Sequence, residues 1–440
     1  MRKIIGIPRS LFYYKYIYLW DKFFKEIGME VIVSDPTNKQ ILDDGVKNCV
    51  DEACLPVKVF HGHVINLIDR VDYIFIPRLT SVSKMEYICP EFGGLPDMIR
   101  HTIKKLPPII DTEINMRRSG KGAIKAAIET GMLLGISKGA AKAAFVNALN
   151  GYKSIRSKEM QGKLPTFEVN IRAASRESGK VDENMYSDSV QAALKASFEK
   201  GASTHSEGIA VGTEVIDKAD TGTHSENTPS AASKAFAETG KGTFSEAIQT
   251  ASAASDKTID NSMTTSEKII AGDDETAITE MTEELYASVS ADKPRIALIG
   301  HPYTVYDKYV SMDIINKLQK FNIDVVTIEM VCQDDINKQA SRLDKPMFWN
   351  YGRNAYGSSL HLALEGNISG MIFLTSFGCG IDSFVNDFIE RQLRRESQIP
   401  FINITIDEHS GEAGFNTRLE AFVDMLRWRG TYEDNIPALG

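Results

Sequence analysis

Apolar and polar positions at both ends of the chain follow a pattern typical of alternating strands and helices. Residues 3–33 begin with a short apolar run, continue with a stretch of helical period and end in a second apolar run. Residues 295–328 repeat this order. Short apolar runs separated by helical stretches favour α/β domains with parallel sheets.

The two ends also share individual residues. Gly6 and Gly300 stand 294 positions apart, and so do Pro8 and Pro302. Both an ancestral duplication and the general similarity of any two β-α-β units explain this correspondence.

The same reading predicts further elements in each half. Helices are expected at 38–49, 56–69, 347–364, 381–393 and 419–428, and strands at 72–77, 369–375 and 401–406. Between the halves, residues 121–149 form two Ala-rich helical stretches interrupted near Gly135.

The middle of the chain has a different composition. Residues 201–290 contain 26 Ser or Thr and 14 Ala but a single Leu, which is too little apolar surface to offset the entropy of ordering. A weak repeat related to Thr-His-Ser-Glu occurs about every 20 residues. We expect a flexible or loosely helical insert, with 280–288 as its best helical candidate.

These patterns predict two Rossmann-like α/β domains with mostly parallel sheets, joined by helices and a low-complexity insert. The expected limits are 1–115 for the first domain, 116–160 for a helical connection, 161–292 for the insert and 293–440 for the second domain.

Composition narrows the class of protein. The 440 residues are 42% hydrophobic and 25% charged with a net charge of −9, so neither a disordered chain nor a nucleic-acid partner is expected. No apolar run is long enough to cross a membrane, and the N-terminus resembles a first strand rather than a signal peptide. Five scattered cysteines favour reduced thiols in the cytoplasm.

Three cysteines stand out because of their neighbours. Cys54 precedes a helix that Pro56 opens, Cys379 lies between a strand and a helix, and Cys89 follows a strand, in a loop. Ligands of open α/β sheets bind at the carboxyl ends of the strands, where Cys89 and Cys379 both fall. One interpretation is therefore that all three thiols lie in one site. The other is that they are buried in the core as small apolar side chains.

A helix N-terminus favours thiolate over thiol and suits an anionic iron–sulfur cluster. Gly378 and Gly380 would let the backbone approach such a group closely. Cys49 and Cys332 are expected in the core, although either could supply a fourth thiolate.

Acid–base candidates lie on the same predicted edge. His301 follows a strand, and Glu408 and His409 follow another, where general acid–base chemistry or loop capping would use them. His61 and His63 point to different faces of one helix, which makes a poor chelate. Lys58 and Arg9 are possible anion contacts.

Some motifs are absent from the sequence. It lacks GxxxxGK[ST], a GxGxxG after the first strand, and GxSxG. A P-loop ATPase, a standard dinucleotide-binding domain and an α/β-hydrolase are therefore not expected.

Several of these segments together resemble a known family. They are Ile5-Gly6-Ile7-Pro8-Arg9, Cys54-Leu55-Pro56-Val57-Lys58, Cys89-Pro90, Gly300-His301-Pro302-Tyr303, Ser376-Phe377-Gly378-Cys379-Gly380 and Ile406-Asp407-Glu408-His409. Over roughly 1–150 and 293–428 the chain resembles acyl-CoA dehydratase activase-related proteins. These are similar to the iron–sulfur subunits of 2-hydroxyacyl-CoA dehydratases and benzoyl-CoA reductase and to double-cubane cluster proteins.

The resemblance implies a function. Cys54, Cys89 and Cys379 would hold a 4Fe–4S or double-cubane cluster in an anaerobic cytoplasm. An activase-type ATPase would supply low-potential electrons, and a CoA thioester or another small molecule would receive them. The sequence leaves open whether two chains form a dimer.

Two other readings remain open from the sequence. One is a metal-free binding or scaffold component of an activase–dehydratase system. The other is a zinc site built from the cysteines with His301 or His409, for which the usual paired spacing is missing.

Overall fold

The computed structural model describes residues 2–160, 293–364 and 368–433. The predicted insert, including its helical candidate at 280–288, lies outside the described residues. The described residues all belong to one compact unit.

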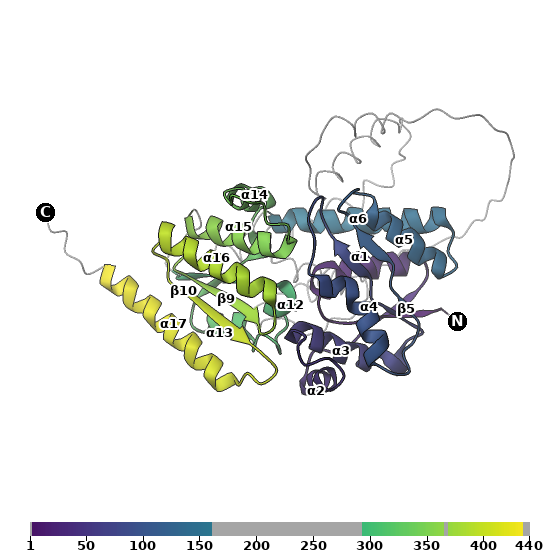
Figure 1. The fold of residues 1–440 in the computed structure, drawn as a ribbon, viewed down its shortest axis with the longest axis horizontal. Coiled ribbons are helices and arrows are strands. Elements are labelled where there is room, and N and C mark those ends of the chain that lie inside the picture. The colour runs from purple at the N-terminus through teal and green to yellow at the C-terminus, as the bar shows by residue number, and fades with distance from the viewer. Residues whose placement is uncertain (1, 161–292, 365–367, 434–440) are drawn as a thin grey trace, which may run out of the picture. The chain divides into compact units, whose positions relative to one another are not determined.

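Each half of this unit contains a four-stranded sheet in which every neighbouring pair is parallel (Figure 1). The first sheet has the order β2-β1-β3-β5 and the second β10-β9-β7-β8. Taken from its other edge, the second sheet has the order β8-β7-β9-β10. The two orders match, because in each sheet the first strand along the chain lies between the second and the third. The prediction of a Rossmann-like α/β fold is confirmed.

The strands of the first sheet are β1 (Ile4–Ile7), β2 (Glu30–Val33), β3 (Tyr73–Phe75) and β5 (Ile109–Ile110). A separate parallel pair joins β4 (Arg78–Ser81) to β6 (Glu113–Asn115). The second sheet contains β7 (Arg295–Ile299), β8 (Asp324–Thr327), β9 (Gly370–Ser376) and β10 (Phe401–Ile406). The pair β4–β6 was not foreseen, because its strands are short and partly exposed.

Helices connect the strands. In the first half they are α1 (Tyr13–Glu26), α2 (Lys39–Lys47), α3 (Leu55–Leu67), α4 (Pro90–Thr102), α5 (Gly122–Leu133) and α6 (Lys138–Met160). In the second half they are α12 (Pro302–Val305), α13 (Ile314–Lys320), α14 (Gln333–Ala340), α15 (Asn350–Leu364), α16 (Gly380–Glu396) and α17 (Glu412–Glu433). Single 3-10 turns occur at Ile68–Arg70 and Ile328–Met330.

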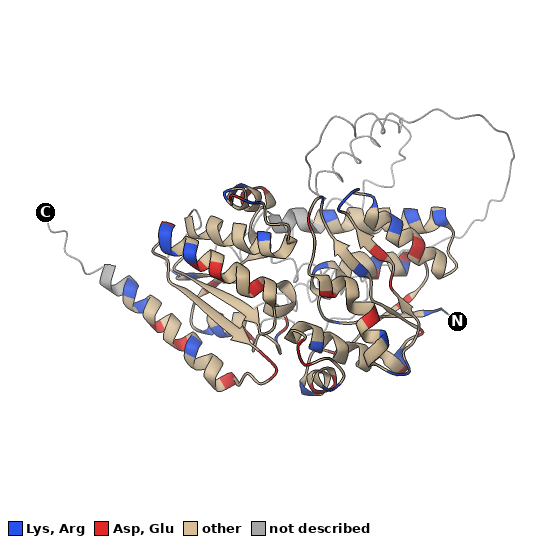
Figure 2. Ribbon diagram, viewed as in Figure 1, with Lys and Arg blue, Asp and Glu red and all other residues tan. Residues whose placement is uncertain are grey.

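Burial follows the expected pattern. All seven residues of β9 are buried, as a central parallel strand requires. Figure 2 shows the charged residues on helices such as α16 and α17, whereas β9 and β10 carry almost none. Gly135, between α5 and α6, has a φ of +87°, which explains the predicted interruption.

The helix α3 differs from a surface helix, since eleven of its thirteen residues are buried. It packs against α2, where Gly45 and Gly62 allow backbone contact: a Cβ at Gly62 would lie 1.8 Å from the Ile41 carbonyl oxygen. The close fit holds α3 in place, and with it Cys54, the residue that caps its N-terminus.

Candidate functional site

Three helices begin where the two halves of the unit meet (Figure 1). Cys54 is the N-cap of α3, Cys89 of α4 and Cys379 of α16. The sequence predicts a loop at Cys89, but in the structure Pro90 begins a helix there, in the first-turn position that proline tolerates.

The N-cap position places backbone N–H groups beside each sulfur. The N–H of Val57 serves Cys54, that of Glu91 serves Cys89, and that of Asp382 serves Cys379. Backbone N–H groups in the first turn of an α-helix lack the usual partner four residues earlier in the helix, although that of Val57 also donates to the Cys54 carbonyl oxygen at 3.0 Å.

All three cysteines line one cavity of about 340 Å³. Two come from the first half of the chain and one from the second. The loop of Cys379 packs directly on Cys54, since a Cβ at Gly378 would lie 3.3 Å from the Cys54 Cα. Gly378 also has a φ of +82°, which favours glycine at this position.

His301 belongs to the same cavity. It caps α12, and its Nε2 lies 2.8 Å from Oδ1 of the buried Asp382. Its ring stacks on Tyr303 with a centroid separation of 4.8 Å and meets Tyr351 edge-on. Burial disfavours the imidazolium, but Asp382 and Cys379 outweigh this effect and raise the pKa of His301 to about 10.

Aromatic side chains form much of the remaining wall. Phe92, Tyr303 and Tyr351 lie in mutual contact with centroids 6.0 to 6.3 Å apart. Tyr87 and Trp349 also line the cavity, and an isolated β-bridge joins them. The cavity is therefore apolar around a small set of sulfur, imidazole and carboxylate groups.

Burial has the largest effect on the pKa of each of the three thiols. It raises the pKa of Cys89 to about 11, and it raises the pKa of Cys54 and Cys379 as well. The helix N–H groups lower each value, as the sequence analysis expected, but by less than burial raises it. At neutral pH these groups are thiols, and a bound metal would have to displace their protons.

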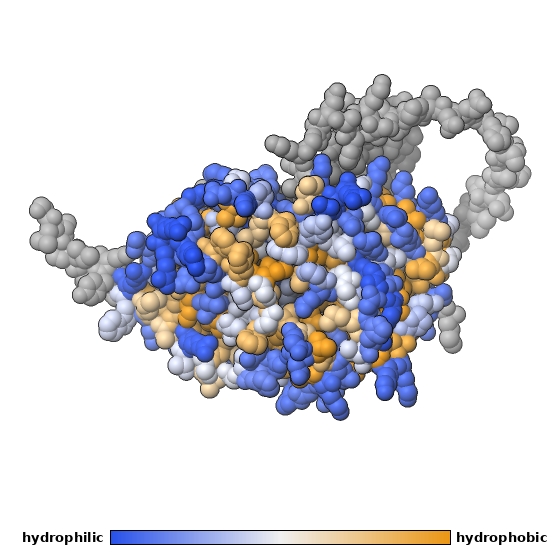
Figure 3. All heavy atoms as spheres, viewed as in Figure 1, coloured by the Kyte–Doolittle hydropathy of each residue, from blue (hydrophilic) through white to orange (hydrophobic). Residues whose placement is uncertain are grey.

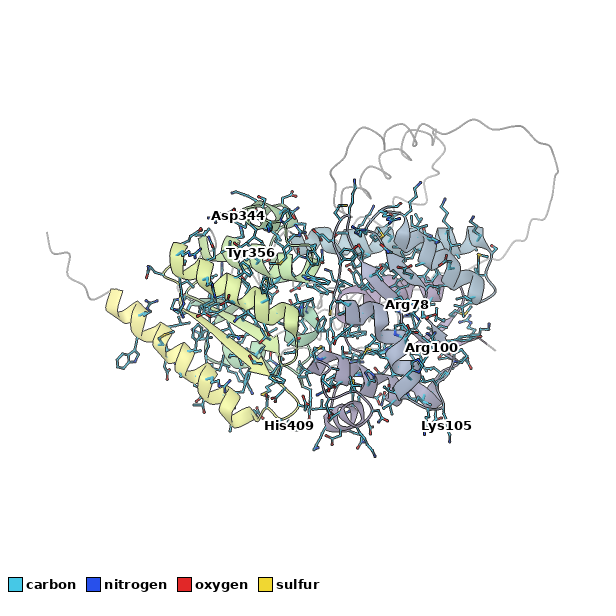
Figure 4. The ribbon with its side chains drawn as sticks, viewed as in Figure 1. Arg78, Arg100, Lys105, Asp344, Tyr356 and His409 are labelled. Carbon is cyan, nitrogen blue, oxygen red and sulfur yellow. The ribbon has the colours of Figure 1, made fainter. Side chains whose placement is uncertain are left out.

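The other candidates lie outside the cavity lining. Glu408 forms a largely buried ion pair with Lys58, one turn after Cys54. His409 is exposed on the loop before α17 (Figure 4). Arg9 donates from its backbone N–H and from Nε to Ser34.

The remaining cysteines do not line this cavity. Cys49 is half-buried, and burial raises its pKa to about 11. Cys332 caps α14 and is also half-buried. His61 and His63 are fully buried, and His63 bonds to Ser34 and Thr37, in agreement with a structural role.

Sequence reasoning missed two carboxylates of the site. Oε2 of Glu91 lies 3.4 Å from the Cys54 Sγ. Asp382 forms a hydrogen bond with His301. One carboxylate oxygen of Asp382, one ring nitrogen of His301 and the sulfur of Cys379 lie within 4.8 Å of one another. Their positions two and three residues after a helix-capping cysteine were the available signal.

The donor set fits an iron–sulfur cluster or another thiophilic metal. Thiolates are the ligands that such clusters require, and the helix N–H groups beside them are the hydrogen bonds that tune them. No side chain besides the three cysteines contributes sulfur to the described lining.

Comparison with known proteins gives a family match. A model described as CoA enzyme activase uncharacterised domain matches residues 4–181 and 184–331, about three quarters of the 440 residues. None of the curated proteins matches the chain. Among the described residues, no helix is both long and apolar enough to cross a membrane.

Proposed function

The chain belongs to the CoA enzyme activase family, and from that premise we propose that it is an iron–sulfur protein that hands single electrons to a small molecule or CoA thioester. The observation that carries this proposal is the meeting of three helix-capping cysteines in one cavity. An ATP-hydrolysing activase-type partner is proposed as the electron source. When bound, the cluster supplies one-electron chemistry at low potential.

The chain's own residues would do three things for such a group. Cys54, Cys89 and Cys379 would bind it as thiolates. The N–H groups of the following helical turns would stabilise negative charge on the sulfurs. The aromatic wall would exclude water, which strengthens each of these interactions.

A second candidate is a site for one zinc ion. His301, Cys379 and Asp382 already hold their ligand atoms within 4.8 Å of one another, and imidazole, thiolate and carboxylate are all zinc ligands. This site would need neither Cys54 nor Cys89. The two candidates therefore predict different effects of single substitutions.

The test is the metal content of single serine variants after anaerobic purification. We expect Cys54→Ser, Cys89→Ser and Cys379→Ser each to lose most of the bound iron and sulfide. Cys332→Ser is the matched control, because Cys332 also caps a helix but lies outside the cavity lining.

Other outcomes identify the alternatives. Zinc that survives Cys54→Ser and Cys89→Ser but not Cys379→Ser would support the single-ion site. A wild-type chain without metal would support a scaffold role. Full cluster content in the triple serine variant would rule out these thiols as ligands.

A further inference from the structure

Large apolar side chains gather around the opening of the thiol cavity. Of the thirteen that are exposed in the described parts of the chain, Tyr87 lines the cavity, and Phe348 and Phe377 immediately precede lining residues. Met85, Phe384 and Phe388 lie within two, three and seven positions of the nearest lining residue in the sequence. We call this set the collar: Met85, Tyr87, Phe348, Phe377, Phe384 and Phe388. Figure 3 shows apolar surface, in orange and tan, across the junction of the two halves on the viewed face.

One side of the collar follows the Cys379 loop. Phe377 is 68% exposed and immediately precedes the lining residue Gly378. Phe384 is 62% exposed, one turn into α16, and its ring lies 4.6 Å from that of Phe388. Two strongly exposed aromatic side chains thus lie within five residues of a proposed ligand.

The other side combines apolar and basic groups. Tyr87 lies 6.3 Å from Phe348, ring to ring, and the guanidinium of Arg117 lies 4.8 Å from the Tyr87 ring centre. The Met85 N–H donates to the Arg117 carbonyl oxygen, which brings the segment with Lys84 beside the one with Arg118 and Lys121. Lys84, Arg118 and Lys121 are exposed.

From this combination we propose that the collar is the docking surface of an acidic protein that carries a one-electron redox centre. Exposed aromatic and Met side chains are typical of the core of protein interfaces, and the basic rim selects an acidic partner. The inference rests on the proposed function, because a protein donor transfers electrons to a buried redox group efficiently only when it docks near one of the ligands of that group.

The test compares a protein donor with a small one. Reduced plant-type ferredoxin serves as the acidic protein probe and titanium(III) citrate as the small reductant, both with the anaerobically purified full chain. One variant combines Phe377→Ser with Phe384→Ser, and another combines Arg118→Glu with Lys121→Glu. The matched controls are Trp428→Ser, which replaces a 75% exposed aromatic residue on α17, and Lys320→Glu on α13.

Both collar variants should accept electrons from ferredoxin at least tenfold more slowly than the wild type. Their iron content and their reduction by titanium(III) citrate should be unchanged, as should every property of the two controls. The wild-type rate with ferredoxin should fall steeply with added salt.

Two results would overturn the docking proposal. One is a wild-type rate with ferredoxin in both collar variants. The other is a wild-type chain that titanium(III) citrate reduces but ferredoxin does not. Failure of the proposed function looks different, since the wild-type chain would then contain no reducible metal group.

Discussion

At the residue scale, capping a helix does not by itself make a cysteine part of the cavity. Cys332 caps α14 as Cys54 caps α3, yet only Cys54 is among the lining residues. What distinguishes Cys54, Cys89 and Cys379 is that their helices start where the two halves meet. Burial then keeps them protonated until a metal competes for the sulfur.

His63 gives a residue-scale prediction for acid stability. Thr37 donates to Asp307, so the network assigns the His63 Nε2–H as donor to Thr37, while Nδ1 accepts from Ser34. Burial lowers the pKa of His63 from 6.5 to about 3. The neutral ring therefore supports the fold fully above pH 6.5, and this support is lost as the pH falls from 6.5 towards 3.

As the pH falls from 6.5 towards 3, His63 takes up a proton in the unfolded chain but not in the folded one. The free energy of unfolding should therefore fall by up to about 1.4 kcal/mol for each pH unit. Urea unfolding at several pH values measures this slope. His63→Gln should show a weaker pH dependence than the wild type. Equal slopes in the two proteins would contradict the assignment.

The sequence could identify the three cavity cysteines because neighbouring Pro and Gly residues and strand ends mark their loops. It did not identify Asp382 or Glu91 as parts of the site, because their positions after a helix-capping cysteine were only a weak signal. Their importance depends on contacts with His301 and Cys54, which come from segments 81 and 37 residues away.

At the element scale, the contact between α2 and α3 holds α3 in place. A Cβ at Gly45 would lie 2.0 Å from the Lys58 carbonyl oxygen, so both contacting glycines exclude a side chain. Most helices and strands were predicted within a few residues, and 401–406 was predicted in full. The helix α4 was missed because its Gly-Gly pair and internal Pro96 are unfavourable to helices.

Gly62→Ala should destabilise the protein by about 1–3 kcal/mol, because the added methyl group forces α2 and α3 apart. Denaturant unfolding measures the loss. Gly94→Ala in α4 is the matched control, since a Cβ there meets nothing within 4 Å. It should be neutral or stabilise the protein by up to about 1 kcal/mol. Equal effects of the two substitutions would contradict close helix packing.

At the scale of the whole molecule, buried and partly buried polar contacts join the two halves. Lys58 pairs with Glu408, Glu86 pairs with Arg353 at 2.6 Å, and the Tyr14 hydroxyl donates to Asp307 at 2.9 Å. Single-sequence patterns indicated two α/β halves but held no signal for these pairs. Figure 4 shows a contrasting cluster, with Arg78 and Arg100 near α4, which pairs only within the first half.

Glu408→Gln should lower the free energy of unfolding by about 3 kcal/mol, because it leaves the Lys58 ammonium buried without its partner. Asp43→Asn breaks the exposed pair with Lys39 and should cost less than about 1 kcal/mol. Chemical denaturation compares the two variants. A loss in Glu408→Gln no larger than that in Asp43→Asn would show that the pair between the halves contributes little.

We propose that three thiols from both halves hold one iron–sulfur group. Iron and acid-labile sulfide per chain, measured with the visible absorption spectrum after strictly anaerobic purification, test it most directly. The account predicts about four irons and four sulfides for one cubane, or about twice as many for a double cubane. A chain that contains no iron, even after reconstitution with iron and sulfide, would contradict the claim and leave the α/β fold without its proposed redox centre.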